Sequence, residues 1–182
     1  NTRLYFNRVP QTTLLEVPRA NGTPGARNST YEANVGPTFS GLLHAPIVPE
    51  AGEDVTVSIV ASDPDGVSSA TLWWNPNNTG WSSAAMSLLD DDGRYEGTIP
   101  GQASSALVQF YVEARDGAGT SATVPAGGRD SRAMFKVEDG QSVLGKVHNV
   151  RIVMPVADAN FMHLDTNVMS NEWLPCTVIY DE

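Results

Sequence analysis

Cysteine, histidine and basic residues are scarce in this chain of 182 residues, and each scarcity excludes a class of structure or partner. The single cysteine, Cys176, cannot form a disulfide within the chain, and one thiol with three scattered histidines cannot build a structural zinc site. The 11 lysines and arginines face 21 aspartates and glutamates, and the resulting net charge of −10 repels nucleic acids and anionic lipid surfaces. Apolar runs are only a few residues long, so the sequence predicts no membrane insertion.

Catalytic motifs are also missing. The histidines at 44, 148 and 163 are far apart, and no nucleophile elbow, P-loop, zinc-protease motif or dinucleotide fingerprint accompanies them. Cys176 lies beside Pro175 in an apolar segment, which favours a small packed residue over a reactive thiolate. The sequence as it stands therefore predicts no enzyme.

The sequence does contain short segments in which apolar and polar residues alternate. The clearest runs over residues 108–115, and a second over residues 55–62, with Gly, Pro and Asp clusters between such segments. The seven expected strands are 38–44, 55–62, 70–75, 84–89, 94–99, 108–115 and 133–137. They predict an all-β fold, a seven-stranded immunoglobulin- or fibronectin III-like sandwich over residues 34–139.

The alternation also predicts which side chains face inward. In such a sandwich the sixth strand lies beside the third, and one aromatic residue of the third strand is buried. The expected core residues are Val57, Ile59, Leu72, Trp74, Phe110, Val112 and Phe135.

The flanks differ from this middle segment. Residues 1–33 have no sustained periodicity and are expected to be a linker and the remnant of a preceding domain. Residues 140–182 have a β-α-β pattern, with strands at 147–154 and 176–180 and a short helix at 155–163 that has Pro155 in its first turn. About 40 residues cannot form a core alone. Because the chain begins with Asn1 and its last segment lacks an evident strand partner, we expect a piece of a longer protein.

Several short segments resemble known families. SDPDGV at 62–67, GRYEGTIPG at 93–101 and FYVEARDGAG at 110–119 resemble Ig-like modules of large secreted bacterial surface proteins. VHNVRIVMPVADANFMHL at 147–164 and TVIYDE at 177–182 look like the opening of a spore coat protein H (CotH)-type kinase-like domain, and TPGARNS at 23–29 is similar to the end of a lamin-tail domain. The resemblance implies that the nucleotide and metal ligands of the kinase-like family lie downstream of Glu182, so this chain is expected to be catalytically silent.

Aspartates follow several expected strands, at loops that a sandwich brings to one end. They are Asp63, Asp65, Asp90, Asp91, Asp92, Asp116 and Asp130. Calcium prefers six to eight oxygen ligands, so Asp63, Asp65 and Asp116 form a candidate calcium site. The alternative, which the sequence favours, is that these side chains bond to the backbone of their own turns. The arginines that border these loops are expected to pair with the carboxylates, and they are Arg94, Arg115, Arg129 and Arg132.

Two adjacent tryptophans must point to opposite faces of their strand. With Trp74 inside, Trp73 faces outward, next to the outward-facing Tyr111 of the sixth strand and near Trp81. Flat rings side by side could stack a sugar, so Trp73, Trp81 and Tyr111 form a candidate aromatic platform. The alternative, again the favoured one, is that Trp73 and Tyr111 simply pack across the strands.

The function predicted first is a non-catalytic spacer and interaction module of a secreted or cell-surface bacterial protein, which positions a neighbouring domain. Its partners would be other domains of the same chain, or a cell-surface protein or glycan. As a bead in a linear array, the module is expected to have its entry and exit at opposite ends. One alternative is a calcium- or carbohydrate-binding module, and another is an accessory fragment of a CotH-type kinase.

Overall fold

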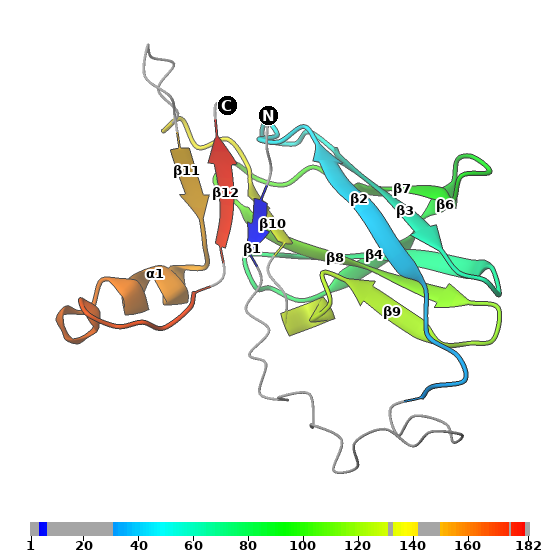
Figure 1. Cartoon of the computed structure of the whole chain (residues 1–182). Coiled ribbons are helices and arrows are strands. Elements are labelled where there is room, and N and C mark those ends of the chain that lie inside the picture. Colours follow the sequence, from blue (N-terminus) through cyan, green and yellow to red (C-terminus); the bar gives the residue numbers. More distant parts are fainter. Residues whose placement is uncertain (1–3, 7–30, 131–132, 142–149, 175, 181–182) are drawn as a thin grey trace, which may run out of the picture.

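Two antiparallel sheets packed face to face dominate the computed structural model, which describes residues 4–6, 31–130, 133–141, 150–174 and 176–180 (Figure 1). The first sheet, in spatial order, consists of β2 (Thr38–Ala45), β3 (Val55–Ser62), β7 (Arg94–Ile99) and β6 (Ser87–Leu88). The second consists of β10 (Ala133–Lys136), β8 (Leu107–Asp116), β4 (Val67–Pro76) and β5 (Ser82–Ala85), and β9 (Ser121–Val124) also pairs with β8. β8 lies beside β4, as the sequence predicted for the sixth and third strands, and β6 and β9 are additional strands.

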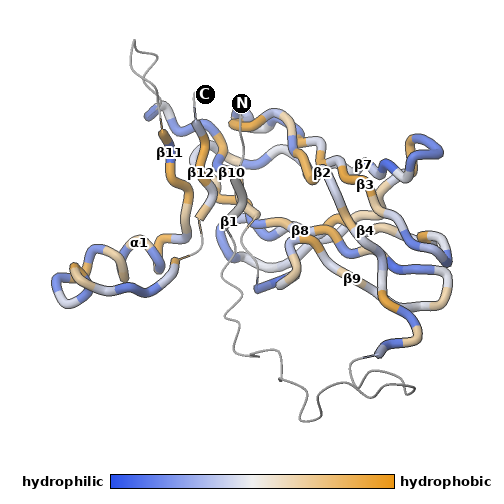
Figure 2. Tube along the Cα trace, in the orientation of Figure 1, coloured by the Kyte–Doolittle hydropathy of each residue, from blue (hydrophilic) through white to orange (hydrophobic). Residues whose placement is uncertain are grey.

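The core between these sheets is the one predicted. All seven expected core residues are buried, and the most exposed of them, Trp74, keeps only 9% of its surface. Hydrophobic residues concentrate on the strands, whereas several loop tips are hydrophilic (Figure 2). The alternating strand β3 has every second residue buried, because one of its faces packs against the other sheet.

Two strands differ from the prediction. The single strand expected at 84–89 is two strands, since β5 belongs to the second sheet and β6 to the first. Met86 lies between them and stays buried in the core while the chain passes from one sheet to the other. β9 was not predicted, because Ser121–Val124 is short and has no clear alternation. It pairs with β8 at residues 112–115, next to the stretch that pairs with β10.

A third, small sheet holds the two ends of the described chain. It consists of β1 (Leu4–Phe6), β12 (Cys176–Tyr180) and β11 (Val150–Val153), with β12 in the centre. β1 lies within residues 1–33, where the sequence indicated no strand, because a strand of three residues has no readable period and depends on its distant partner. β1 and β12 lie side by side (Figure 1). The sandwich itself is entered and left at opposite ends, as expected, because Asn34 donates to Asp116 at one end of β8, whereas Lys136 pairs with Leu107 at the other.

The C-terminal elements otherwise follow the sequence. α1 (Val156–Met162) begins directly after Pro155, the 3-10 turn η2 (Asp165–Asn167) follows it, and β12 has the predicted bounds. Within the described residues α1 is the one α-helix, and it is too short to cross a membrane. The part of the strand expected at 147–149 lies outside the described residues, and β11 covers the remainder up to Val153.

The small sheet packs against the sandwich and has no core of its own, as its length predicted. Met134 of β10 is fully buried with Val153 and Ile179, and Ile47 and Leu107 pack against them. The backbone N–H of Met134 also donates to the hydroxyl of Thr177 at 3.2 Å. The C-terminal extension and the sandwich therefore share one apolar cluster.

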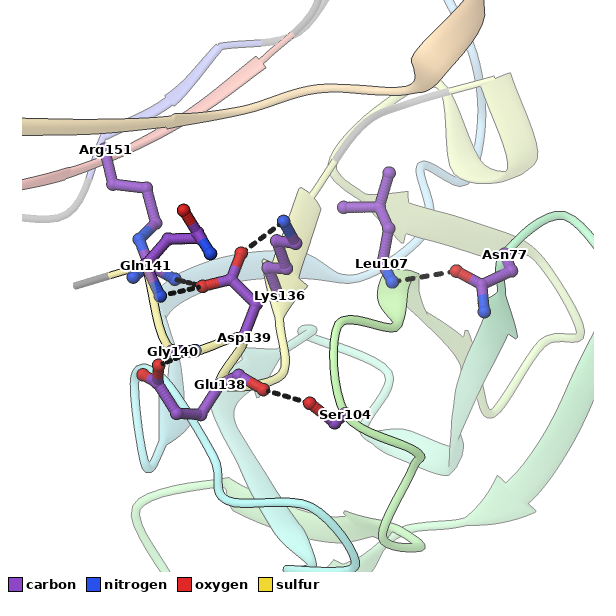
Figure 3. A network of polar contacts seen from close by, with 9 residues as sticks. All are labelled: Asn77, Ser104, Leu107, Lys136, Glu138, Asp139, Gly140, Gln141 and Arg151. Atoms are coloured by element: carbon purple, nitrogen blue, oxygen red, sulfur yellow. Dashed lines mark hydrogen bonds and ion pairs between the residues drawn. The ribbon is translucent and has the colours of Figure 1, made fainter.

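A network of charged groups ties this extension to the end of the sandwich (Figure 3). The carboxylate of Asp139 accepts a hydrogen bond from the Lys136 ammonium and lies 3.7 Å from a guanidinium nitrogen of Arg151 on β11. The hydrogen bond from Lys136 holds the pKa of Asp139 below its ordinary value, helped by the backbone N–H of Gln141 and the charge of Arg151, although burial acts to raise it.

Replacing Asp139 with asparagine should lower the free energy of unfolding at pH 7 by about 1.5–3 kcal/mol, the contribution typical of a hydrogen bond to a charged group. Because the folded pKa is lowered, this contribution is complete above the ordinary aspartate pKa of about 3.9 and is lost as the pH falls through the folded value. Urea unfolding from pH 7 to pH 2 measures both effects. Asp92→Asn, at an exposed turn position, is the control and should change little at any pH. An equal loss in both variants would contradict the role of Asp139.

Candidate functional site

The loops after β3 and β8, which carry several of the aspartates, do come together at one end of the sandwich, as the order of the strands predicted. The backbone N–H of Gly117 donates to the carbonyl of Gly66 at 3.0 Å, which joins the loop after β8 to the loop after β3. A hollow of about 330 Å³ lies between Asp63 and the 90–92 turn. Asp130, however, belongs to the 3-10 turn η1 (Gly128–Asp130), which contacts β8 from the outer face of the second sheet.

The candidate calcium ligands Asp63, Asp65 and Asp116 do not converge. Asp63 accepts the backbone N–H of Asp65 at 2.8 Å, which is the turn chemistry favoured from the sequence. Asp116 is buried and accepts the side-chain amide of Asn34 at 2.6 Å and the backbone N–H of Thr120 at 2.8 Å. Burial acts to raise the pKa of Asp116, but these hydrogen bonds outweigh it and leave the pKa lowered. No group of three acidic, histidine or cysteine side chains among the described residues is arranged to hold a metal ion.

The histidines and the cysteine are not grouped either. His44 is buried between Phe110 and Phe135, with ring centroids 5.6 and 5.5 Å away. His163 is exposed at the end of α1, and His148 lies outside the described residues. Burial raises the pKa of the half-buried Cys176 thiol, which makes it a poor nucleophile at neutral pH, as predicted.

The outer face of the second sheet carries the predicted aromatic residues. Trp73 and Tyr111 are cross-strand partners, and their rings lie almost parallel with centroids 5.9 Å apart. Trp81 meets Tyr111 edge-on at 5.0 Å. We call Trp73, Trp81, Tyr111 and Arg129 the aromatic cluster, because the Arg129 guanidinium lies 5.2 Å from the Trp73 ring and 6.0 Å from the Trp81 ring.

This arrangement modifies the predicted platform. Tyr111 does face out of the sheet, but it keeps only 4% of its surface, so its ring packs across the strands and supports its neighbours. Trp73 and Trp81 are half-buried and remain the rings that a ligand can reach. Arg129, expected to pair with an aspartate, instead has its guanidinium 5.2 Å from the Trp73 ring, whereas Arg94 does pair with Asp90 at 3.7 Å, and Arg132 lies outside the described residues.

A pocket of about 230 Å³ lies on the same face, beyond the row of the aromatic cluster. Asn75 and Gln109 are cross-strand partners two positions from Trp73 and Tyr111, so they form the next row on that face. The remaining wall comes from the turn after β4, from β10 and from the start of α1. The lining residues are Asn75, Asn77, Asn78, Leu107, Gln109, Met134, Pro155, Val156 and Ala157. We call this space the amide pocket.

Hydrogen bonds fix the side-chain amides of this pocket. Asn75 accepts the backbone N–H of Gly80 at 3.0 Å, and Asn77 accepts the backbone N–H of Leu107 at 2.9 Å (Figure 3). Gln109 donates to the backbone carbonyl of Arg129 at 3.0 Å, which connects the pocket to the aromatic cluster. The Nδ2 group of Asn77 makes no hydrogen bond within the described part of the chain and is open to a ligand.

One polar atom of the aromatic cluster lacks a partner. The indole Nε1 of Trp73 is buried and makes no hydrogen bond in the described structure. Leaving a buried donor unpaired costs about 1–3 kcal/mol, and such groups concentrate at functional sites.

Sequence reasoning found the aromatic residues and missed the amide pocket. The segment Asn75–Asn78 is rich in turn formers, and this signal predicts a loop without indicating what the loop faces. The pocket is completed by Pro155 and Val156, which are distant in sequence and come into place only when the extension packs on the sandwich.

Comparisons with known proteins add little to this geometry. No protein-family model matches the chain, and no curated protein matches it, so no relative supports a CotH-type kinase-like or lamin-tail domain. Among solved structures, the chain is similar to one described as "Crystal structure of Br derivative BhCBM56", a carbohydrate-binding module. The match covers 50% of this chain and 86% of that chain, with 14% sequence identity and a TM-score of 0.34. A likeness at this level leaves the function to be inferred from the residues of the site.

Proposed function

We propose that this chain is a non-catalytic carbohydrate-binding module, with its saccharide site on the outer face of the second sheet. The observation that carries the proposal is that two reachable tryptophans, Trp73 and Trp81, lie on the same face as a pocket lined by side-chain amides, with the amide pair Asn75 and Gln109 in the row next to Trp73 and Tyr111. This develops the carbohydrate alternative drawn from the sequence and adds the amide residues to it.

The two halves of the site match the two kinds of surface on a sugar. The C–H face of a pyranose ring is apolar and packs on a flat aromatic ring. Its hydroxyl groups donate and accept hydrogen bonds at once, and a side-chain amide such as that of Asn77 can do the same. At about 230 Å³ the amide pocket is smaller than the ~300–1,000 Å³ of typical ligand pockets, so it suits a single sugar unit of a longer chain.

The proposal is tested by calorimetric titration with a panel of short oligosaccharides, neutral and acidic. Replacing Trp73 or Trp81 with alanine should weaken the affinity at least tenfold, because each variant removes a stacking surface. Trp173→Ala is the matched control, since Trp173 lies on the C-terminal extension with 83% of its surface exposed and should leave the affinity unchanged. The proposal fails if no saccharide binds at millimolar concentration, or if all three variants behave alike.

A second candidate function is the positioning of a neighbouring domain, which is the function that the sequence predicted first. The observation that supports this function is an apolar surface on the extension after β11, where α1 and the following loop project away from the sandwich (Figure 1). Val156, Val168, Met169 and Trp173 each expose more than 70% of their surface there, and exposed apolar patches mark interaction sites. The proposed occupant of this surface is a CotH-type domain, because residues 147–182 resemble the opening of such a domain. A lamin-tail domain would precede the sandwich.

Both functions suit a protein that works outside the cytoplasm, at a cell surface or in the medium, where polysaccharides are accessible. That location remains a proposal, as does the lack of catalytic activity. If no saccharide binds in the titrations, the positioning function becomes the leading one.

A further inference from the structure

We infer that the saccharide is an acidic one, and that Arg129 binds its carboxylate. This inference rests on the proposed function and names the ligand class of the same site. It begins from the place of the Arg129 guanidinium, which lies over Trp73 and Trp81, while the backbone carbonyl of Arg129 accepts a hydrogen bond from Gln109 of the amide pocket.

The turn that carries this cation is fixed by the backbone. Within η1, the N–H of Gly128 donates to the carbonyl of Pro125 and the N–H of Asp130 to the carbonyl of Gly127, both at 2.9 Å. The carbonyl of Arg129 itself accepts the amide of Gln109, a residue of the pocket wall. Folding therefore places the arginine beside the proposed sugar site, although its side chain remains exposed.

No carboxylate neutralises this guanidinium in the part of the chain that the structure describes. Three of the other four described cations have such partners, since Arg94 pairs with Asp90, and Arg151 and Lys136 with Asp139, whereas Arg115 forms no ion pair with a described residue. The chain carries 21 acidic residues, yet the guanidinium of Arg129 contacts the rings of Trp73 and Trp81 and no acidic side chain among the described residues. The residues that line the amide pocket within the described ranges are likewise all neutral.

A guanidinium stacked on a ring keeps its N–H groups at its edge, where they match the two oxygens of a carboxylate. A uronic acid unit presents such a carboxylate on the same ring whose C–H face packs on tryptophan. Acidic side chains near Arg129 do not compete: Asp130 follows it in η1 and Glu113 lies in the next outward row of β8, and neither forms an ion pair with it. The site thus combines one anion-binding group with neutral hydrogen-bonding groups.

A galacturonate trisaccharide and its methyl ester test this inference, because esterification removes the charge and leaves the sugar rings unchanged. Short oligosaccharides are preferable because the net charge of −10 repels long polyanions. The unmodified chain should bind the acid at least tenfold more tightly than the ester. Arg129→Gln should abolish that preference and Arg129→Lys should retain part of it, while Arg94→Gln, a matched change at the end of the sandwich, should keep it whole.

Two results would overturn the inference and separate it from the proposed function. If the ester or neutral oligosaccharides bind as tightly as the acid and Arg129→Gln changes nothing, the acidic ligand is excluded while carbohydrate binding stands. If neither acidic nor neutral saccharides bind, both proposals fail together. Thermal melting of each variant confirms that binding is measured on folded protein.

Discussion

Replacing Phe110 with alanine should lower the free energy of unfolding by about 3–5 kcal/mol, the cost typical of removing a buried aromatic side chain. Phe110 is fully buried at the middle of β8, with the rings of Phe135 and His44 at 6.1 and 5.6 Å. β8 has paired strands on both sides, β4 on one and β10 on the other, so the surrounding sheet cannot collapse into the cavity. A loss of this size is a large share of the 5–15 kcal/mol of a typical domain.

Urea unfolding followed by circular dichroism measures this loss. The matched control is Phe161→Ala, which makes the same change on α1, where the ring keeps 38% of its surface exposed and is outside both core clusters. That variant should lose less than about 1 kcal/mol, because little apolar surface returns to water. A loss below about 1 kcal/mol for Phe110→Ala would mean that β8 turns its other face to the core.

The parts of the fold that could be predicted are those with one buried and one exposed face. β3 and β7 have the predicted bounds, because alternation of apolar and polar residues is enforced wherever a strand separates core from solvent. The sides of the two adjacent tryptophans followed from the same rule: Trp74 lies in the core, and Trp73 lies beside Tyr111 on the outer face.

The parts that could not be predicted depend on contacts between distant segments. The break between β5 and β6 is hidden in the sequence, since Met86 stays in the core on either path of the chain. β1 has three residues and exists through its pairing with β12, so only the folded chain defines it.

The site shows the same limit. Arg129 is close to acidic loops in the sequence, which predicted an ion pair with an aspartate. η1 instead brings Arg129 to the outer face of the second sheet, where its guanidinium stacks on the Trp73 ring. The burial of the Tyr111 side chain could not be predicted from its position in the strand. Alternation predicts which face of the sheet a side chain is on, but not which other residues pack over that face. Of the residues that the sequence analysis missed, Asn75 and Gln109 could have been found, because alternation places them on the same face as Trp73 and Tyr111.

The adjacent residues Trp73 and Trp74 offer the sharpest separation of fold from function. Trp74→Ala should lower the free energy of unfolding by about 3–5 kcal/mol, because the ring fills the core between the two sheets. Trp73→Ala should lose about 1–2 kcal/mol, since its half-buried ring makes one stacked aromatic contact and one cation–π contact.

Saccharide binding should respond in the opposite order. Titrations under conditions where both variants are folded should show the affinity weakened at least tenfold by Trp73→Ala and nearly unchanged by Trp74→Ala, because Trp74 faces away from the site. Equal losses of stability would refute the assignment of faces on β4. An equal loss of affinity in two folded variants would instead show that binding depends on the shape of the whole sheet, and the aromatic cluster would then lose its place as the saccharide site.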